Sequence, residues 1–235
     1  MNSFLSLLLF YILLGLGSSR GFSQETDTEN RSLKFSCLYW EGKPQENLYY
    51  REGESFHPLK FKQAARSESF ALKGMKNFEL YREAIDPQED EPPYTLLAQA
   101  SLPTAKQVLL LVIPFEAQER TNYRVIAMDD SLSTFPTGTF RFANFTNQPL
   151  IIKFADKVEK LAAGKLVVMK CQSGKQGGFE PLLIGNSEGK TIFGTRLFGQ
   201  PTSRDLAFIS PPVKKGAMPR VKFITQLVPP TKNPE

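Results

Sequence analysis

Apolar and polar residues alternate in short segments along most of the chain after residue 24. In FELYR at 78–82, Phe78 and Leu80 fall on one face of an extended strand and Glu79 falls on the other. Similar segments recur about every ten residues and are bounded by the turn-forming residues Gly, Pro, Asn and Ser. Helical periodicity is confined to 64–75 and 155–165, where it covers one or two turns. The pattern predicts an all-β protein.

The chain also contains a weak internal repeat with an offset of 90 to 98 residues. The segments PTAKQVLLLVIP at 103–114 and PTSRDLAFISPP at 201–212 both open on Pro-Thr, continue through an apolar run and end in proline. Shorter matches occur in the same order along the chain, which predicts two tandem copies of one β-domain, at 33–129 and 135–228. These matches pair His57-Pro58-Leu59 with Gln148-Pro149-Leu150, Leu72-Lys73-Gly74 with Ala162-Ala163-Gly164, Pro114 with Pro211, and Arg124-Val125 with Arg220-Val221.

The spacing of strands and turns in each copy is typical of a small sandwich. A unit of about ninety residues with about seven short strands fits an immunoglobulin-like sandwich or a related small barrel. The polar link MDDSLSTFPTGT at 128–139 is too short for free tumbling, so we expect the two copies to pack end to end. The predicted fold is therefore two tandem immunoglobulin-like β-sandwich domains.

The first 23 residues have the features of a secretory signal peptide. A nearly unbroken apolar run at 4–16 precedes small residues suited to cleavage, whereas a bilayer span needs roughly twenty apolar residues. We expect export to the periplasm or the extracellular space, with an uncleaved N-terminal anchor as the alternative. No second apolar run of this length follows, so we expect no transmembrane span after signal cleavage, and we expect 229–235 to form a flexible tail.

Charge is distributed unevenly between the two halves of the chain. Residues 24–120 carry 12 Lys or Arg and 16 Asp or Glu, whereas residues 121–235 carry 16 and 8, which gives net charges of −4 and +8. A basic half can bind an anionic partner, such as an envelope protein or polysaccharide, although scattered lysines also fit an ordinary solvated surface. Export and the dispersion of the lysines argue against nucleic acid. The candidate binding residues are Lys153, Lys157, Lys160 and Lys165.

Residue types that support catalysis or metal binding are sparse. The single histidine, His57, has no nucleophile motif near it, and one histidine with two distant cysteines cannot supply a zinc site. We expect no catalytic residues, no bound metal and no cofactor. Cys37 and Cys171 fall at unrelated points of the repeat, so we expect free thiols, and any disulfide would have to join the two domains. Asp129 and Asp130 suit a turn, with a calcium site as the alternative.

An aromatic cluster in the first copy offers an alternative function. If Trp40, Tyr49 and Tyr50 were exposed together, they could stack on a sugar ring, and the protein would be a carbohydrate-binding module or a weak glycan-active enzyme. The same rings could equally form the core-facing edge of the first sheet. Exposure of Trp40 distinguishes the two interpretations.

The segment GTFRFANFTNQPLIIKF at 138–154 resembles the opening of small immunoglobulin-like repeats in exported bacterial envelope proteins. In those repeats a G-x-[FY]-R-F-x-N strand leads into a second strand after x-x-P. The resemblance covers about forty residues of the second copy, and the first copy lacks the Arg-Phe-x-Asn motif. It implies a fold and an exported location, and no catalytic residue carries over. We therefore expect an exported, non-enzymatic protein that binds or supports another cell-envelope component, either a protein or an anionic polymer.

Overall fold

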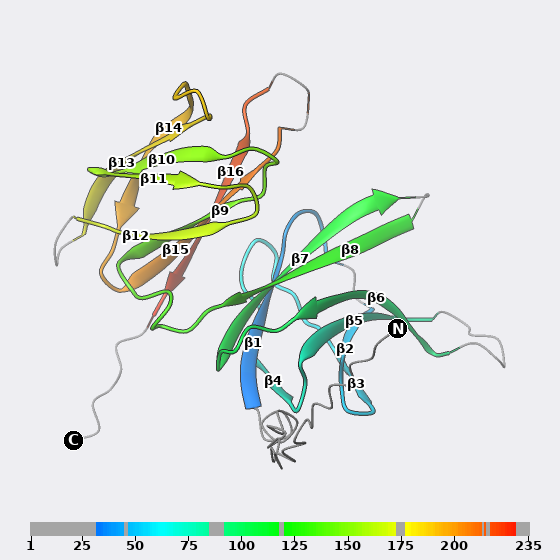
Figure 1. Cartoon of the computed structure of the whole chain (residues 1–235). Helices are drawn as coiled ribbons and strands as arrows, with labels where there is room; N and C mark the ends of the chain where they lie inside the picture. Colours follow the sequence, from blue (N-terminus) through cyan, green and yellow to red (C-terminus); the bar gives the residue numbers. More distant parts are fainter. Residues whose placement is uncertain are drawn as a thin grey trace, which may run out of the picture.

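The computed structural model describes residues 32–44, 47–84, 92–117, 120–172, 177–212, 214 and 217–228. These residues form sixteen β-strands in four sheets of four strands each (Figure 1). The all-β prediction is confirmed. Within the same ranges, no helix has the length and apolarity needed to cross a bilayer. The expected signal peptide at 1–23 and tail at 229–235 lie outside the described residues.

The first domain comprises strands β1 to β8. One of its sheets has the order β4-β1-β7-β8 and the other the order β3-β2-β5-β6. Strands β1 and β7 run parallel, and the other neighbouring pairs are antiparallel. The strands are Ser32–Tyr39 (β1), Leu48–Glu52 (β2), Ser55–Pro58 (β3), Phe70–Lys73 (β4), Asn77–Glu83 (β5), Tyr94–Ser101 (β6), Gln107–Ala117 (β7) and Arg120–Asp129 (β8).

The second domain, β9 to β16, repeats this topology. Its sheets have the orders β12-β9-β15-β16 and β11-β10-β13-β14, and its one parallel pair is again formed by the first and seventh strands, β9 and β15. The predicted pair of tandem β-sandwiches is therefore confirmed, with eight strands in each copy where the spacing predicted about seven. The strands are Thr139–Asn144 (β9), Leu150–Phe154 (β10), Lys157–Leu161 (β11), Leu166–Lys170 (β12), Gly178–Gly185 (β13), Thr191–Gly199 (β14), Ser203–Ser210 (β15) and Arg220–Leu227 (β16).

The shared topology identifies which sequence matches join equivalent positions. Pro103 and Pro201 both lie in the loop that precedes the central parallel strand, β7 or β15. Arg124 and Arg220 lie on β8 and β16, which are equivalent edge strands. These matches, in the last third of each domain, therefore join structurally equivalent positions.

Two other matches join positions that are not equivalent. Pro58 ends β3, whereas Pro149 precedes β10, the equivalent of β2. Gly74 follows β4, whereas Gly164 precedes β12, the equivalent of β4. Pro and Gly recur at turns throughout β-proteins, so a match at a turn carries little positional information.

Each sandwich encloses its own apolar core between its two sheets. Along β1, Phe35 and Cys37 point into the first core because alternate residues of a strand face the same side. Phe35 meets Tyr50 across this core with ring centroids 5.0 Å apart. The second core is dominated by phenylalanines, among them Phe142 and Phe154, whose centroids are 5.6 Å apart.

A third apolar core joins the two domains. The outward faces of β1, β7 and β8 pack against the outward faces of β9, β15 and β16, so the domains meet through sheet faces and not end to end as expected. Strands β7 and β15 are therefore covered on both faces, which explains why VLLLVI at 108–113 is continuously apolar. The buried members are Leu38, Trp40, Leu109, Leu111, Met128, Phe135, Ala143, Leu206, Phe208 and Ile224.

Candidate functional site

The expected aromatic platform does not form. Trp40 is 6% exposed and lies in the core between the domains, edge-on to Phe208 at 5.3 Å and to Phe145 at 6.0 Å. Tyr49 and Tyr50 are consecutive on β2, so they point to opposite faces, and Tyr50 belongs to the first core. The three rings cannot present one stacking surface because packing between the domains and strand alternation separate them.

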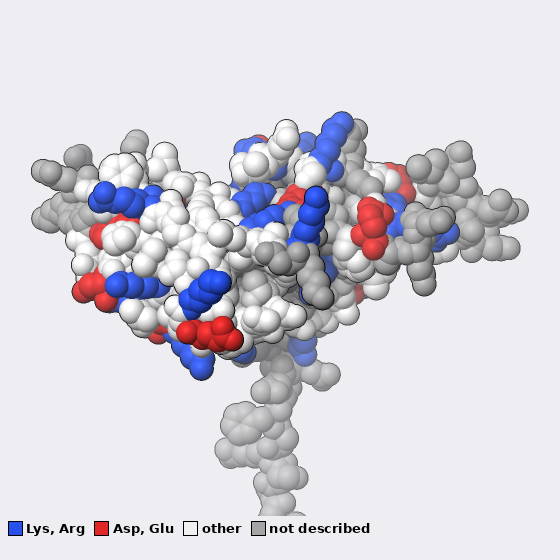
Figure 2. Space-filling view, turned by 90° about the horizontal axis from the view of Figure 1, so that it is seen from above, with Lys and Arg blue, Asp and Glu red and all other residues white. Residues whose placement is uncertain are grey.

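The four candidate lysines are all exposed, but the structure brings only two of them onto one face. Lys153 on β10 and Lys160 on β11 both lie on the outer face of the sheet β11-β10-β13-β14. Lys157 points to the other side of β11, because it pairs with the core residue Phe154. Lys165 lies in the loop before β12. Figure 2 likewise shows basic side chains dispersed among uncharged and acidic ones.

The outer face that holds Lys153 and Lys160 is also strongly apolar. Phe179 is 62% exposed and Val158 is 58% exposed, and exposed apolar side chains gathered on one face are typical of interaction sites. Cross-strand register connects the members, since Phe179 is opposite Phe198 and Leu183 is opposite Lys153. We call the following set the apolar–basic face: Ile151, Lys153, Val158, Lys160, Phe179, Pro181, Leu183, Arg196 and Phe198.

The charges on the apolar–basic face are all positive. Its cations are Lys153, Lys160 and Arg196, and none of its members carries a carboxylate. The guanidinium of Arg196 lies over the ring of Phe179, 5.9 Å from its centroid, and Phe179 meets Phe198 edge-on at 5.1 Å. The face points away from the first domain, because the other sheet of the sandwich makes the contact between domains (Figure 1). It is therefore open to a partner.

The equivalent face of the first domain pairs its polar groups internally. Arg51 forms an ion pair with Glu79 at 2.8 Å, and the hydroxyl of Tyr49 donates to a carboxylate oxygen of Glu83 at 2.7 Å. The ring of Phe56 stacks on the ring of Tyr94 with centroids 3.9 Å apart. Two copies of one sheet have thus acquired different surfaces, and only the second presents cations beside exposed apolar side chains without an acidic residue.

Sequence reasoning missed the aromatic half of the apolar–basic face. The second half of β13, Pro181 to Ile184, is apolar on both faces, because Leu182 and Ile184 enter the core while Pro181 and Leu183 point outward. A short continuous apolar run of this kind is normally interpreted as part of a fully buried strand. The exposure of β13 follows from the sheet order and not from its local sequence, since β13 belongs to the sheet that faces away from the contact between the domains.

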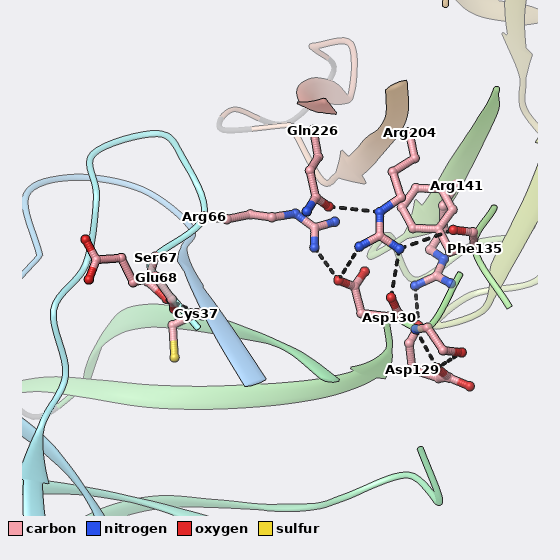
Figure 3. A network of polar contacts seen from close by, with 11 residues as sticks. Cys37, Arg66, Ser67, Glu68, Asp129, Asp130, Phe135, Arg141, Arg204 and Gln226 are labelled. Carbon is pink, nitrogen blue, oxygen red and sulfur yellow. Dashed lines mark hydrogen bonds and ion pairs between the residues drawn. The ribbon is translucent and has the colours of Figure 1, made fainter. Parts of the chain in front are cut away.

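A separate polar cluster lies where the domains meet, and sequence reasoning named Asp130 from it but none of its arginines (Figure 3). Two arginines share one oxygen of Asp130: Arg66 from the β3–β4 loop donates through Nη1, and Arg204 from β15 donates through Nη2 at 2.9 Å. Arg204 also donates to the carbonyls of Asp130 and Phe135 and to the amide oxygen of Gln226. We call Arg66, Asp130, Arg141 and Arg204 the junction cluster.

The ring of Phe135 organises two of these arginines. Arg141 lies 4.2 Å and Arg204 lies 5.2 Å from its centroid, so two guanidinium groups contact one buried ring. Arg141 also donates to the carbonyl of Asp129 at 2.7 Å. Burial lowers the pKa of Arg141 to about 10, the nearby Asp130 and Asp129 oppose this, and the charges of Arg204 and Arg66 add to the lowering.

The adjacent acids Asp129 and Asp130 have different roles. Asp129 accepts from the backbone and hydroxyl of Ser131 and from the hydroxyl of Thr134, so the turn expected from the sequence is present here. Burial alone would raise the pKa of Asp129, but these hydrogen bonds together lower it. Asp130 instead pairs with arginines from both domains, a role that sequence reasoning did not predict.

The remaining candidates have ordinary surroundings. His57 stacks on Tyr50 with centroids 5.2 Å apart and lies 3.9 Å from a carboxylate oxygen of Glu52. Cys37 and Cys171 are free and lie in or beside the two separate domain cores, and burial raises the pKa of the Cys171 thiol to about 11. Among the described residues, no three or more His, Cys, Asp or Glu side chains come together as a metal site would require.

The chain matches no protein-family model, and no curated protein matches it significantly.

Proposed function

We propose that the protein is an exported, non-enzymatic binding protein that docks a negatively charged protein surface on its apolar–basic face. The observation that carries the proposal is the pairing of exposed Phe179 and Phe198 with Arg196, Lys153 and Lys160, on a sheet face without a carboxylate. Binding of an acidic partner would neutralise the three cations and remove the two rings from water.

The chemistry of the face favours a protein over an anionic polysaccharide. Aromatic and Arg side chains are enriched where protein partners make their strongest contacts, and Arg196 over Phe179 has this composition. An acidic polysaccharide would pair with the cations but has little aliphatic surface to cover Val158 and Leu183. The proposed partner is therefore an acidic protein of the cell envelope with an exposed apolar centre.

The test measures fluorescence anisotropy with two labelled peptides of the same length. One contains four Glu and four Leu in a Gly/Ser background, and the other contains Lys in place of each Glu. We expect the acidic peptide to bind more tightly, and we expect its affinity to fall as salt is raised. The variant Lys153→Gln/Lys160→Gln/Arg196→Gln should weaken binding by roughly tenfold or more, since each lost charge contact contributes up to about 1 kcal/mol.

Matched controls separate the face from the overall charge. Arg51→Gln changes a cation at the equivalent face of the first domain and should leave binding unchanged. Phe179→Ser/Phe198→Ser keeps every charge and should weaken binding through loss of apolar contact. Equal binding of both peptides, or equal losses in Arg51→Gln and the triple variant, would contradict the proposal. Tighter binding of anionic vesicles or of alginate than of the acidic peptide would assign the face to lipid or polysaccharide.

A further inference from the structure

One edge of a guanidinium group in the junction cluster has no partner. Nη1 of Arg66 donates to Asp130, whereas Nε and Nη2 are buried and make no hydrogen bond within the described part of the chain. The side chain as a whole is 9% exposed. The Nε–H and Nη2–H groups project from the same edge of the guanidinium plane, and this edge matches two oxygens of a phosphate or carboxylate.

The junction cluster also carries an excess of positive charge. Arg141 and Arg204 are buried, the side chain of Arg66 is largely buried, and Asp130 is the carboxylate that pairs with Arg66 and Arg204. The carboxylate of Asp129 accepts hydrogen bonds from its own turn and its charge also acts on Arg141, so three cations lie near two carboxylates. Buried charge without a counter-charge is unfavourable, so this arrangement favours an anion close by.

A polar cavity adjoins the cluster. Its volume is about 330 Å³, which is within the usual range for small-molecule sites. Lys34 and Arg66 of the first domain and Arg204 and Gln226 of the second all line it, together with Asp130. A ligand in this cavity would therefore contact both domains. Further polar lining comes from Ser36, Ser67, Ser69 and Gln107.

The carboxylate of Asp130 determines which anion can bind in this cavity. Its Oδ2 accepts from Arg66 and Arg204, but its Oδ1 is buried and has no hydrogen-bond partner among the described residues. An ionised carboxylate oxygen only accepts hydrogen bonds, so it attracts a ligand that carries a proton and repels one that does not. Protonated phosphate can donate to Oδ1, whereas sulfate, of similar size and shape, cannot.

We propose that this cavity binds a phosphate group, held by the Nε–Nη2 edge of Arg66 and by Lys34, with a phosphate hydroxyl donating to Oδ1 of Asp130. The site lies in a different part of the molecule from the apolar–basic face and does not depend on the proposed function. Because both domains contribute lining residues, bound phosphate also stabilises their contact.

The test uses the full mature chain at pH 6.0, where phosphate is protonated. Isothermal titration and thermal unfolding are measured with inorganic phosphate, glycerol phosphate and sulfate, each against chloride at equal ionic strength. We expect both phosphates to bind and to raise the melting temperature, because a ligand that binds only the folded state stabilises it. We expect the affinity for sulfate to be lower than that for phosphate by about tenfold or more, since sulfate leaves Oδ1 of Asp130 without a donor.

Three variants assign the site. Arg66→Gln removes the charge, and Arg66→Lys keeps the charge but removes the paired donors, so both should lose about tenfold or more in phosphate affinity. Lys34→Gln changes an exposed cavity residue outside the ion-pair network and keeps the test valid if the Arg66 variants fail to fold. Arg196→Gln on the apolar–basic face is the control and should bind phosphate as the wild type does.

The outcomes are distinct. Tighter binding of glycerol phosphate would indicate a phosphate carried on an organic body, and tighter binding of inorganic phosphate would indicate the free ion. The inference is overturned if neither phosphate binds more tightly than chloride, if sulfate binds as tightly as phosphate, or if Lys34→Gln binds phosphate as tightly as Arg196→Gln does. None of these results bears on peptide binding, so this proposal and the proposed function can fail separately.

Discussion

At the scale of single residues, the environment of each acid decides its role more than its position in the sequence does. Asp205 on β15 is buried, and it accepts hydrogen bonds from the hydroxyls of Ser203 at 2.9 Å and of Thr225. Burial raises its pKa above the ordinary 3.8, and the two hydrogen bonds only partly oppose this. In contrast to Asp130, no arginine pairs with it in the described structure.

The raised pKa of Asp205 predicts a pH-dependent stability difference. A carboxyl group with a raised folded pKa binds its proton more tightly in the folded state, so its ionised form destabilises the protein above that pKa. The substitution Asp205→Asn should therefore be most favourable, relative to the wild type, at neutral pH. This relative advantage should decrease as the pH falls through the raised pKa toward 3.8.

The measurement is urea unfolding of both proteins between pH 7 and pH 4. Any change in hydrogen bonding caused by the amide adds a constant offset, so the trend with pH is the test and not its absolute value. A difference in free energy of unfolding that is independent of pH would mean that Asp205 has an ordinary pKa in the folded protein.

At the scale of elements, the central strands β7 and β15 contact two cores at once. On β7, Leu110 points into the first domain core, while the next residue, Leu111, points into the core between the domains. A strand in this position needs apolar residues on both faces, as in a parallel sheet covered on both sides. The sequence similarity between 103–114 and 201–212 therefore reflects two equivalent strands, each buried against the sheet of the other domain.

This arrangement predicts that both faces of β7 matter for stability. Leu111 is fully buried, so Leu111→Ala should destabilise the protein by about 2–5 kcal/mol through lost contacts and a new cavity. Leu96 on β6 is 51% exposed, and Leu96→Ala should change stability by about 0.5 kcal/mol or less. Chemical denaturation measures both. Similar effects of the two substitutions would show that the core between the domains does not form.

At the scale of the whole molecule, the duplicated sandwiches use equivalent sheets to contact each other and leave the other two sheets facing outward. Polar contacts support the core between the domains: Arg220 pairs with Glu41 at 2.5 Å, and Lys222 donates to the backbone carbonyl of Trp40. The domains therefore form one continuous unit, with one outward face neutralised internally and the other apolar and basic.

The position of Trp40 makes it a reporter of contact between the domains. As the single tryptophan, at 6% exposure, it should be shielded from iodide in the folded protein and accessible after unfolding. Its emission and the far-UV circular dichroism should change at the same denaturant concentration, because the shared core couples the two domains. A change in Trp40 emission at lower denaturant than the loss of strand signal would show that the domains separate first.

The sequence by itself determined the all-β class and the tandem duplication. Alternation in segments such as FELYR has a period set by strand geometry. The repeat is still visible at the central strands β7 and β15 because both need apolar residues on both faces. Local pattern could also identify the turn at Asp129, since its hydrogen bonds involve residues within five positions.

Only the tertiary structure decided which surfaces are covered. Trp40, Phe179 and Leu111 all lie in apolar strands or at their ends, yet Phe179 is exposed and the other two are buried. The reason is that sheet order and domain packing determine which face of a strand meets water. The junction cluster unites Arg66, Asp130 and Arg204, whose separations of 64 and 74 residues leave no local signal. Long-range contacts of this kind depend on the whole fold. The junction cluster is built from them, and the apolar–basic face depends on one, the pairing of β10 with β13.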